Sequence, residues 1–295
     1  MSRTYKATGI NLRGKPIGES DRILTIFTRE WGLIQAVAPG ARKHQSHLRG
    51  RAELFIVNDL LIAKGRSLDR IIQADTVASY PRLSQDLGKL AAAQYLAELI
   101  LYQSPIGNQD PLFLLLSEHL NRLEQLPGTP APSTCVQIIA YLTHGLFHLL
   151  AWAGIAPQVQ YCSRTQHPLI PQEADPNWRA RFSIEGGGIF LDSPSTPTPS
   201  QDRGAGGATI GASSPRLIIP INSVQLAILQ QLAKPQLPEL TQDTPGEDFL
   251  HWQEWIFIER ILRQYAEYHL DCSIRSASLI DACFPTPNHR FPSQT

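Results

Sequence analysis

The 295-residue sequence predicts an α+β protein of several domains, in which a small closed β-barrel precedes a helical bundle. Apolar residues alternate in five short segments before residue 80, and from about residue 84 they recur at helical spacing. Charge is also divided unevenly. Residues 1–82 hold 14 of the 26 Lys and Arg but only 7 of the 26 Asp and Glu, which gives +7 there and −7 in the rest. The neutral total therefore hides a basic first domain, which suits contact with a polyanion.

Five segments of the first 80 residues have strand character. A short Arg29-Glu30 connector favours a hairpin between the second and third, and a Lys64-Gly65-Arg66-Ser67 turn joins the last two. Because no helix long enough for a parallel crossover interrupts them, we expect a closed barrel of the OB type. The five segments are 5–13, 22–28, 31–38, 53–63 and 68–77.

The connector at residues 39–51, Pro-Gly-Ala-Arg-Lys-His-Gln-Ser-His-Leu-Arg-Gly-Arg, is the most informative part of the sequence. It places four fixed positive charges between predicted strands, and its glycines let main-chain N–H groups approach a ligand closely. This composition suits a phosphodiester backbone, although a solvated surface loop has a similar one. The candidate DNA contacts are Arg42, Lys43, Arg49 and Arg51 on this connector, and Lys64 and Arg66 on the later turn.

Aromatic side chains of a barrel can serve as stacking platforms for the bases of a single strand. The first domain offers Tyr5, Phe27, Trp31 and Phe55. Burial is the commoner fate of such residues, so we expect most of the four to lie in the core.

The sequence after the barrel, from about residue 84 to residue 153, predicts three helices. Ser84 is the expected cap of a helix through residue 102, and Asp110-Pro111 opens a second helix through residue 126. A third helix, at 133–153, is apolar nearly all round and belongs in the middle of a bundle.

Helical pattern resumes at 222–233 and 247–269. Before it, residues 192–216 are rich in Pro, Ser and Gly, which favours a disordered linker. We expect an OB domain, a first helical part, an insertion that contains this linker, and a return to the helical domain with a C-terminal tail. The corresponding ranges are 1–82, 83–153, 154–220 and 221–295.

Several classes of protein are disfavoured. The first residues lack the apolar run of a signal peptide, and no stretch reaches about 18 uncharged apolar residues, so we expect a cytosolic protein without a membrane span. Four scattered cysteines fit a reducing compartment.

The sequence has no phosphate-binding Gly-Lys loop and no nucleophile elbow. His144 and His148 share a helix face, but no glutamate follows His144, so core histidines are favoured over metal ligands.

Residues 18–55 contain an acidic-Ser segment, an apolar-Phe-Thr strand, a glycine turn, then Gly-Ala-Arg and Ser-x-Leu-Arg-Gly. This order of motifs resembles the RecO family of DNA-repair proteins. Residues 154–162 are similar to the segment that enters the family's zinc-binding insertion, and residues 265–276 are similar to its closing helix. One departure is Pro39, which stands where many members place a lysine.

The resemblance implies an OB domain, a helical domain with a small zinc-type subdomain, and no catalytic activity. Members bind single- and double-stranded DNA, anneal complementary strands, and act with RecR and RecF to load RecA onto strands coated by single-strand-binding protein. Such a protein is cytoplasmic and nucleoid-associated. The helical domain of some members docks the acidic, Phe-ended tail of the coating protein. For that contact the candidate residues here are Leu115, Leu116 and Arg122.

The zinc site departs from the family pattern of paired Cys-x-x-Cys motifs. Cys162 fills the first position, but Thr165, Leu191 and Pro194 take the others. One thiolate cannot hold a tetrahedral Zn²⁺, so we expect a degenerate insertion without metal and no cofactor. A different site is a weaker possibility, from Cys162, His167 and Cys272 or Cys283.

Two other hypotheses compete with a role as a recombination mediator. One is a metal-dependent nuclease or hydrolase that uses His144, His148 and scattered acids. The other is a peptide adaptor that does not bind DNA. The first would alter the length of labelled DNA with Mg²⁺ or Mn²⁺, and the second would bind an acidic Phe-ended peptide without affinity for DNA.

Overall fold

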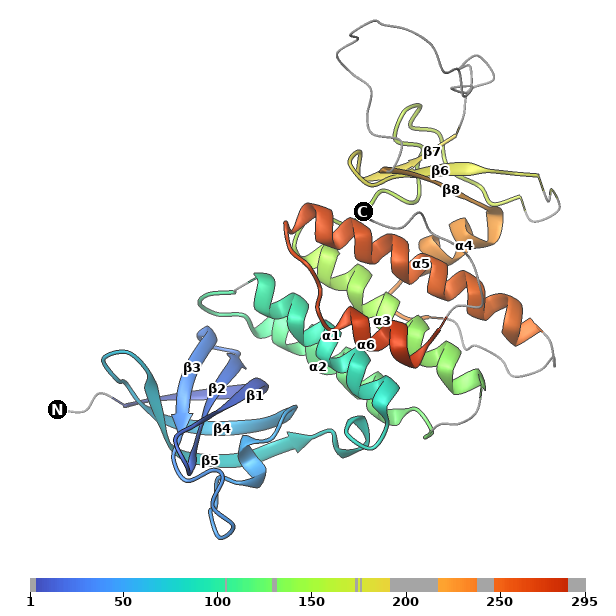
Figure 1. Cartoon of the computed structure of the whole chain (residues 1–295). Helices are drawn as coiled ribbons and strands as arrows, with labels where there is room; N and C mark the ends of the chain where they lie inside the picture. Colours follow the sequence, from blue (N-terminus) through green and yellow to red (C-terminus); the bar gives the residue numbers. More distant parts are fainter. Residues whose placement is uncertain are drawn as a thin grey trace, which may run out of the picture. The chain divides into compact units, whose positions relative to one another are not determined.

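The structure, a computed structural model, describes residues 4–103, 105–128, 132–172, 175, 177–191, 217–237 and 247–285. Five strands form a closed barrel in the order β1-β2-β3-β5-β4, and helices follow it along the chain (Figure 1). The predicted OB-like barrel and helical C-terminal part are therefore confirmed. The strands are β1 Thr4–Ile17, β2 Asp21–Thr28, β3 Gly32–Ala38, β4 Ile56–Ala63 and β5 Asp69–Ser79.

β1 closes the barrel because it is long enough to pair with two neighbours. Residues 4–10 pair with β4 and residues 9–17 pair with β2, and a bulge between Asn11 and Arg13 bends the strand between them. β3 meets β5 only in a short parallel contact. The interior is filled by inward-facing apolar side chains of all five strands, among them Ala7, Leu24, Ala36, Ile62 and Ile71.

The five predicted helices are present, and a short sixth was not predicted. The first begins later than expected, since residues 81–83 form a 3-10 turn and the Asp86 carboxylate, rather than Ser84, accepts the N–H of Lys89 at 3.1 Å. The helices are α1 Leu87–Gln103, α2 Asp110–Gln125, α3 Pro132–Trp152, α4 Ser223–Leu232, α5 Glu247–His269 and α6 Ala277–Cys283.

Within the described residues, α3 is the helix whose length and composition would suit a membrane span. Its apolar window, Thr134–Trp152, is 72% buried inside the protein. Burial of this extent is typical of the core helix of a globular domain, as its nearly continuous apolar surface predicted.

The turn between β2 and β3 docks against the connection between α1 and α2. Leu33 donates its N–H to the carbonyl of Pro105 at 2.9 Å, and Gln109 donates to the carbonyl of Arg29 at 2.6 Å. Gly32 lies between these bonds with φ of 71°. The Arg29 guanidinium also pairs with the carboxylate of Asp110. Main-chain bonds and an ion pair thus join the barrel to its first two helices.

The chain divides into two compact units, Met1–Gly145 with Ile274–Thr295, and Leu146–Ser273. The second unit contains a small sheet in the order β7-β6-β8, and residues 184–187 turn the chain between β6 and β7. The predicted linker at 192–216 lies outside the described residues. The strands are β6 Ala180–Ser183, β7 Gly188–Phe190 and β8 Ile218–Ile221.

Candidate nucleic-acid interface

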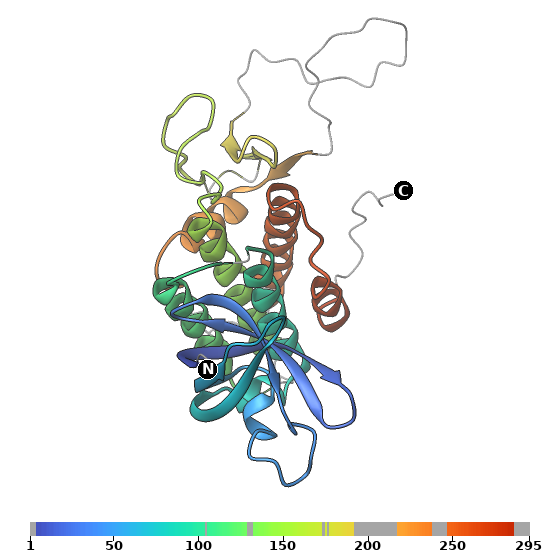
Figure 2. The same ribbon diagram turned by 90° about the vertical axis from the view of Figure 1, so that its left-hand side faces the viewer.

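The basic connector between β3 and β4 is anchored by its main chain. Figure 2 shows it as the light-blue loop that projects from the barrel. Gly40 donates its N–H to the carboxylate of Asp21 at 2.7 Å, and Arg42 donates its N–H to the carbonyl of Ser20 at 2.8 Å. Because backbone groups hold the loop against the β1–β2 turn, its long side chains can remain available to a ligand.

The four predicted cations of this loop have different surroundings. Arg42, Lys43 and Arg49 are exposed, and Arg42 makes one side-chain hydrogen bond, to the carbonyl of Gly18 at 3.0 Å. Within the described part of the chain, the side chains of Lys43 and Arg49 have no hydrogen bond or ion pair. Arg51 is half-buried, donates to the carbonyl of His47 at 2.9 Å and lies 3.9 Å from Asp75. Three of the four charges are thus available to phosphate.

The β4–β5 turn carries the two remaining candidates, Lys64 and Arg66, which are both exposed. The Asp69 carboxylate fixes this turn by accepting the N–H of Gly65 at 3.0 Å, and it also accepts the hydroxyl of Tyr5 at 2.5 Å. Burial and then this hydrogen bond raise the pKa of the Tyr5 hydroxyl.

Arg70, which the sequence reasoning missed, adds to the positive charge that acts on Asp21. The Asp21 carboxylate accepts from the Gly40 N–H at 2.7 Å and from the Ser20 hydroxyl at 2.8 Å. The hydrogen bond from Gly40, the one from Ser20 and then the charges of Arg70 and Lys43 lower the pKa of Asp21. Arg70 lies on β5 and Lys43 on the β3–β4 loop, so no local motif encodes their common effect on this carboxylate.

A second arginine was missed at the start of β2. Arg22 and Arg42 line a cavity of about 370 Å³ together with Glu53. The Arg22 guanidinium donates to the Glu53 carboxylate at 2.8 Å, so it is neutralised within the protein. Both groups are partly exposed, and the pair adds little to stability.

Only two of the four candidate aromatic residues remain accessible. Phe27 is fully buried and Phe55 is 2% exposed. Trp31 is 50% exposed, packs edge-on against the half-buried Tyr5 with ring centroids 5.5 Å apart, and donates its indole N–H to the carbonyl of Lys6 at 3.2 Å. Most of the set is thus in or near the core, as expected.

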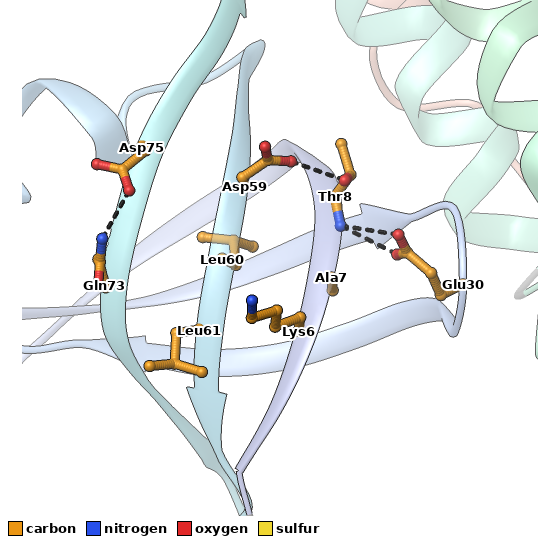
Figure 3. A pocket seen from close by; sticks show the side chains of 9 residues that line it. All are labelled: Lys6, Ala7, Thr8, Glu30, Asp59, Leu60, Leu61, Gln73 and Asp75. Carbon is orange, nitrogen blue, oxygen red and sulfur yellow. Dashed lines mark hydrogen bonds between the residues drawn. The ribbon is translucent and has the colours of Figure 1, made fainter.

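Another hollow of the barrel surface has the opposite charge. Figure 3 shows this pocket of about 370 Å³, in which Glu30, Asp59 and Asp75 line the walls beside Lys6. Two of the carboxylates are held by Thr8, whose N–H donates to Glu30 at 3.0 Å and whose hydroxyl donates to Asp59 at 2.7 Å. Phosphate would be repelled here, so this pocket is a poor place for DNA.

The predicted partner-binding residues on α2 need correction. Leu116 is 1% exposed and lies in the core, so its side chain cannot contact a partner. Arg122 is largely buried, and it binds the Glu118 carboxylate at 2.9 Å and Nδ1 of His144 at 3.0 Å. Leu115 is half-exposed beside the more exposed Leu114. Of the three predicted residues, Leu115 is the one whose side chain is accessible and is not engaged in the core or in an ion pair.

The two histidines of α3 have separate roles. His144 is fully buried, and because Arg122 donates to its Nδ1, its proton lies on Nε2. Nε2 of His148 lies 3.1 Å from the carbonyl of Lys234. Among the residues that the structure describes, no group of three or more His, Cys, Asp or Glu could hold a metal ion.

Residues 162–167 form a tight hydrogen-bonded turn at Cys162. Cys162 donates its N–H to the carbonyl of His167 and accepts from Gln166, which has φ of 59°. Although burial raises the pKa of the Cys162 thiol, hydrogen bonds from the Thr165 hydroxyl and the N–H groups of Leu191, Thr165 and Arg164 lower it to about 7. Thr165 and Leu191 donate hydrogen bonds where thiolates would be needed, so this donor set does not fit Zn²⁺.

Comparison with known proteins agrees with this architecture. Residues 1–80 match the family model "Recombination protein O N terminal", and residues 84–277 match "Recombination protein O C terminal". A DNA repair protein RecO of Nostoc sp. strain PCC 7120 is 48% identical, over 98% of this chain and 99% of its own length. The RecO of Trichodesmium erythraeum is 49% identical over 95% of each chain, and that of Synechocystis sp. is 42% identical over 96% and 98%. The chain therefore belongs to the RecO family of DNA repair proteins.

Proposed function

We propose that the protein binds single- and double-stranded DNA, anneals complementary strands and, with RecR, helps load RecA onto DNA coated by single-strand-binding protein. RecF is a further candidate partner, and the site of action is the cytoplasmic nucleoid. The observation that carries DNA binding is the basic β3–β4 loop, whose exposed Arg42, Lys43 and Arg49 have no carboxylate within ion-pair distance among the described residues.

The proposed mechanism is electrostatic and requires no bond to be made or broken. Two complementary strands repel one another through their phosphates. A protein that neutralises several phosphates on each strand releases counterions and raises the local concentration of the strands. If the bases stay accessible, pairing becomes faster. No catalytic group is assigned, and the protein acts as a mediator rather than an enzyme.

Removing the loop charges tests this function. We expect Arg42→Gln, Lys43→Gln and Arg49→Gln together to make the dependence of log affinity on log salt shallower by about three, one for each lost phosphate contact. The measurement is fluorescence anisotropy with labelled oligonucleotides over a salt series. Annealing of paired oligonucleotides, with and without the coating protein, should slow in parallel.

The control for this test is Arg82→Gln, which removes one exposed cation outside the barrel strands. It should leave both the salt dependence and annealing close to wild type. Unchanged affinity and salt dependence in the triple variant would contradict the function proposed for the loop.

We also propose that the helical part receives the acidic, Phe-ended tail of the coating protein, with Leu115 among the contacts. The division into an OB domain at 1–82, helical parts at 83–153 and 221–295, and an insertion at 154–220 belongs to the same proposal. The insertion is a degenerate form of the family's zinc-type subdomain, in which hydrogen bonds to Cys162 take the place of metal coordination.

The degenerate insertion predicts metal independence. Purified protein should contain zinc far below one equivalent by inductively coupled plasma mass spectrometry, and EDTA should leave its Tm unchanged. Cys135→Ser serves as a control for general thiol effects. One equivalent of zinc that disappears in Cys162→Ser, but not in Cys135→Ser, would show that the insertion binds metal after all.

A further inference from the structure

Two aliphatic side chains of β5 lie on the surface of the barrel. Ile72 is 52% exposed and Val77 is 58% exposed, whereas Ile71 and Ala74 of the same strand are almost fully buried. The register between β4 and β5 skips Ile72 and Val77, so each is the extra residue of a β-bulge. A bulge re-aims a side chain relative to simple alternation, and here it leaves two aliphatic groups in contact with water.

These side chains flank the pocket of Figure 3. Gln73 and Asp75 line that pocket from β5. Ile72 directly precedes Gln73, and its exposure excludes the inner face of the barrel. Val77 follows Asp75 by two positions, the spacing that returns a side chain to the same face of a strand. At about 3.3 Å per residue, the two aliphatic groups are roughly 16 Å apart along β5, with the pocket between them.

Two carboxylates of this pocket face one another across the sheet. Asp59 of β4 is directly opposite Asp75 of β5 in the register, and both are exposed. Like charges at such positions destabilise a sheet. Glu30 adds a third carboxylate, Lys6 offsets part of the charge, and Arg51 reaches Asp75 only at 3.9 Å. A further cation bound between the two strands would therefore relieve a repulsion that the fold leaves in place.

The charge of this face decides which ligand it suits. DNA is repelled by the carboxylates, and a second copy of the same face would bring two acidic pockets together. Among the described residues, no group of three or more His, Cys, Asp or Glu could hold a metal ion. A polypeptide with lysine or arginine satisfies the carboxylates, and its aliphatic residues can cover Ile72 and Val77. The face therefore suits a cationic segment of another protein.

We propose that this β4–β5 face, defined by Asp59, Ile72, Asp75 and Val77, docks a segment of a partner protein in which lysine or arginine lies between aliphatic residues. An extended segment needs about five residues to span roughly 16 Å, so its aliphatic side chains are about five positions apart. The docking goes beyond the DNA binding proposed above and does not depend on it, because it uses a face of opposite charge.

The test is an NMR titration of the full-length, ¹⁵N-labelled protein with an end-capped peptide, Leu-Ser-Lys-Lys-Ser-Leu. We expect chemical-shift changes centred on residues 57–61 and 71–78, and an affinity that falls with added salt. The peptide Leu-Ser-Glu-Glu-Ser-Leu should not bind. The double variant Asp59→Asn with Asp75→Asn should weaken binding roughly tenfold, since each exposed ion pair contributes a few-fold. Ile72→Ser with Val77→Ser should weaken it by a similar factor, because the aliphatic contact is lost.

Matched controls change the same kinds of side chain elsewhere. Glu19→Gln with Glu185→Gln removes two exposed carboxylates, and Ile106→Ser removes an aliphatic side chain that is 86% exposed. Both controls should keep the wild-type affinity for the lysine peptide. An unchanged Tm shows that each variant is folded.

Equal binding of the lysine and glutamate peptides, or no binding of either, would overturn the proposal. So would a variant with Asp59→Asn and Asp75→Asn that behaves like the controls. A dimer in sedimentation velocity that is lost in Ile72→Ser with Val77→Ser would assign the face to a second copy of the chain instead. DNA affinity should not fall in either double variant, so this result is independent of that of the basic-loop variant.

Discussion

Gly32→Ala should destabilise the first compact unit by about 3 kcal/mol, among the largest effects expected of one methyl group. Two costs add. Gly32 has φ of 71°, a left-handed conformation that costs an L-residue roughly 1–2 kcal/mol. A Cβ built on it would lie 2.1 Å from the carbonyl oxygen of Pro105, so the backbone of the α1–α2 connection must move. Urea unfolding followed by circular dichroism measures the loss as a lower midpoint.

Gly18→Ala separates conformational strain from steric overlap. Gly18 has φ of 56°, similar to that of Gly32, but a Cβ there meets nothing within 4 Å. This control should lose roughly 1–2 kcal/mol, the strain alone. Equal losses in the two variants would show that the close approach of Pro105 to Gly32 adds nothing to the cost of a Cβ there.

Glu98→Gln should release the C-terminal segment from α1, at a cost of about 2 kcal/mol at pH 7. The Glu98 carboxylate is 8% exposed and accepts four hydrogen bonds, from the N–H groups of Arg275 and Ser276 and from the hydroxyls of Ser276 and Tyr102. Glutamine keeps the shape, but it removes the charge and turns an NH₂ group toward some of these donors. Urea unfolding measures the loss, and hydrogen exchange should rise in residues 274–284.

The Glu98 effect should depend on pH. Burial raises the pKa of Glu98, but the hydrogen bonds from Ser276, Arg275 and Tyr102 outweigh it and lower that pKa below its ordinary 4.5. The carboxylate therefore contributes its full stability above about pH 4.5, and that contribution is lost as pH falls through the lower folded-state pKa. The difference in free energy of unfolding between wild type and Glu98→Gln should therefore shrink as pH falls through this range. The control variant is Glu19→Gln, because Glu19 is exposed. A free-energy difference between wild type and Glu98→Gln that stays constant with pH would contradict this account.

Local patterns predicted the barrel and the long helices because each signal lies within one element. Alternation marked the five strands, and Asp110-Pro111 marked the start of α2. The predicted start of α1 was wrong. Ser84 and Asp86 are both good N-cap residues, and the 3-10 turn at 81–83 places the start of the helix after Asp86. The seven residues of α6 are too few for a periodic signal to identify.

Site residues were harder to predict because their surroundings come from distant parts of the chain. The charges of the β3–β4 loop are visible in the sequence, but the contact of Arg51 with Asp75 is not. On α2, an apolar run of leucines does not reveal which side chain faces the core, and the structure buries Leu116 while exposing Leu114. Arg70 acquires its place only through the register between β3 and β5.

The acidic pocket beside Thr8 has a consequence for encounters in solution. With Glu30, Asp59 and Asp75 gathered there and Arg13, Lys15 and Arg70 elsewhere on the same barrel, the domain has an electric dipole moment. A polyanion diffusing nearby experiences a torque that turns the protein before contact, so a larger share of collisions is productive. Added electrolyte shortens the range of this steering, and the association rate constant should fall with ionic strength more steeply than the dissociation rate rises.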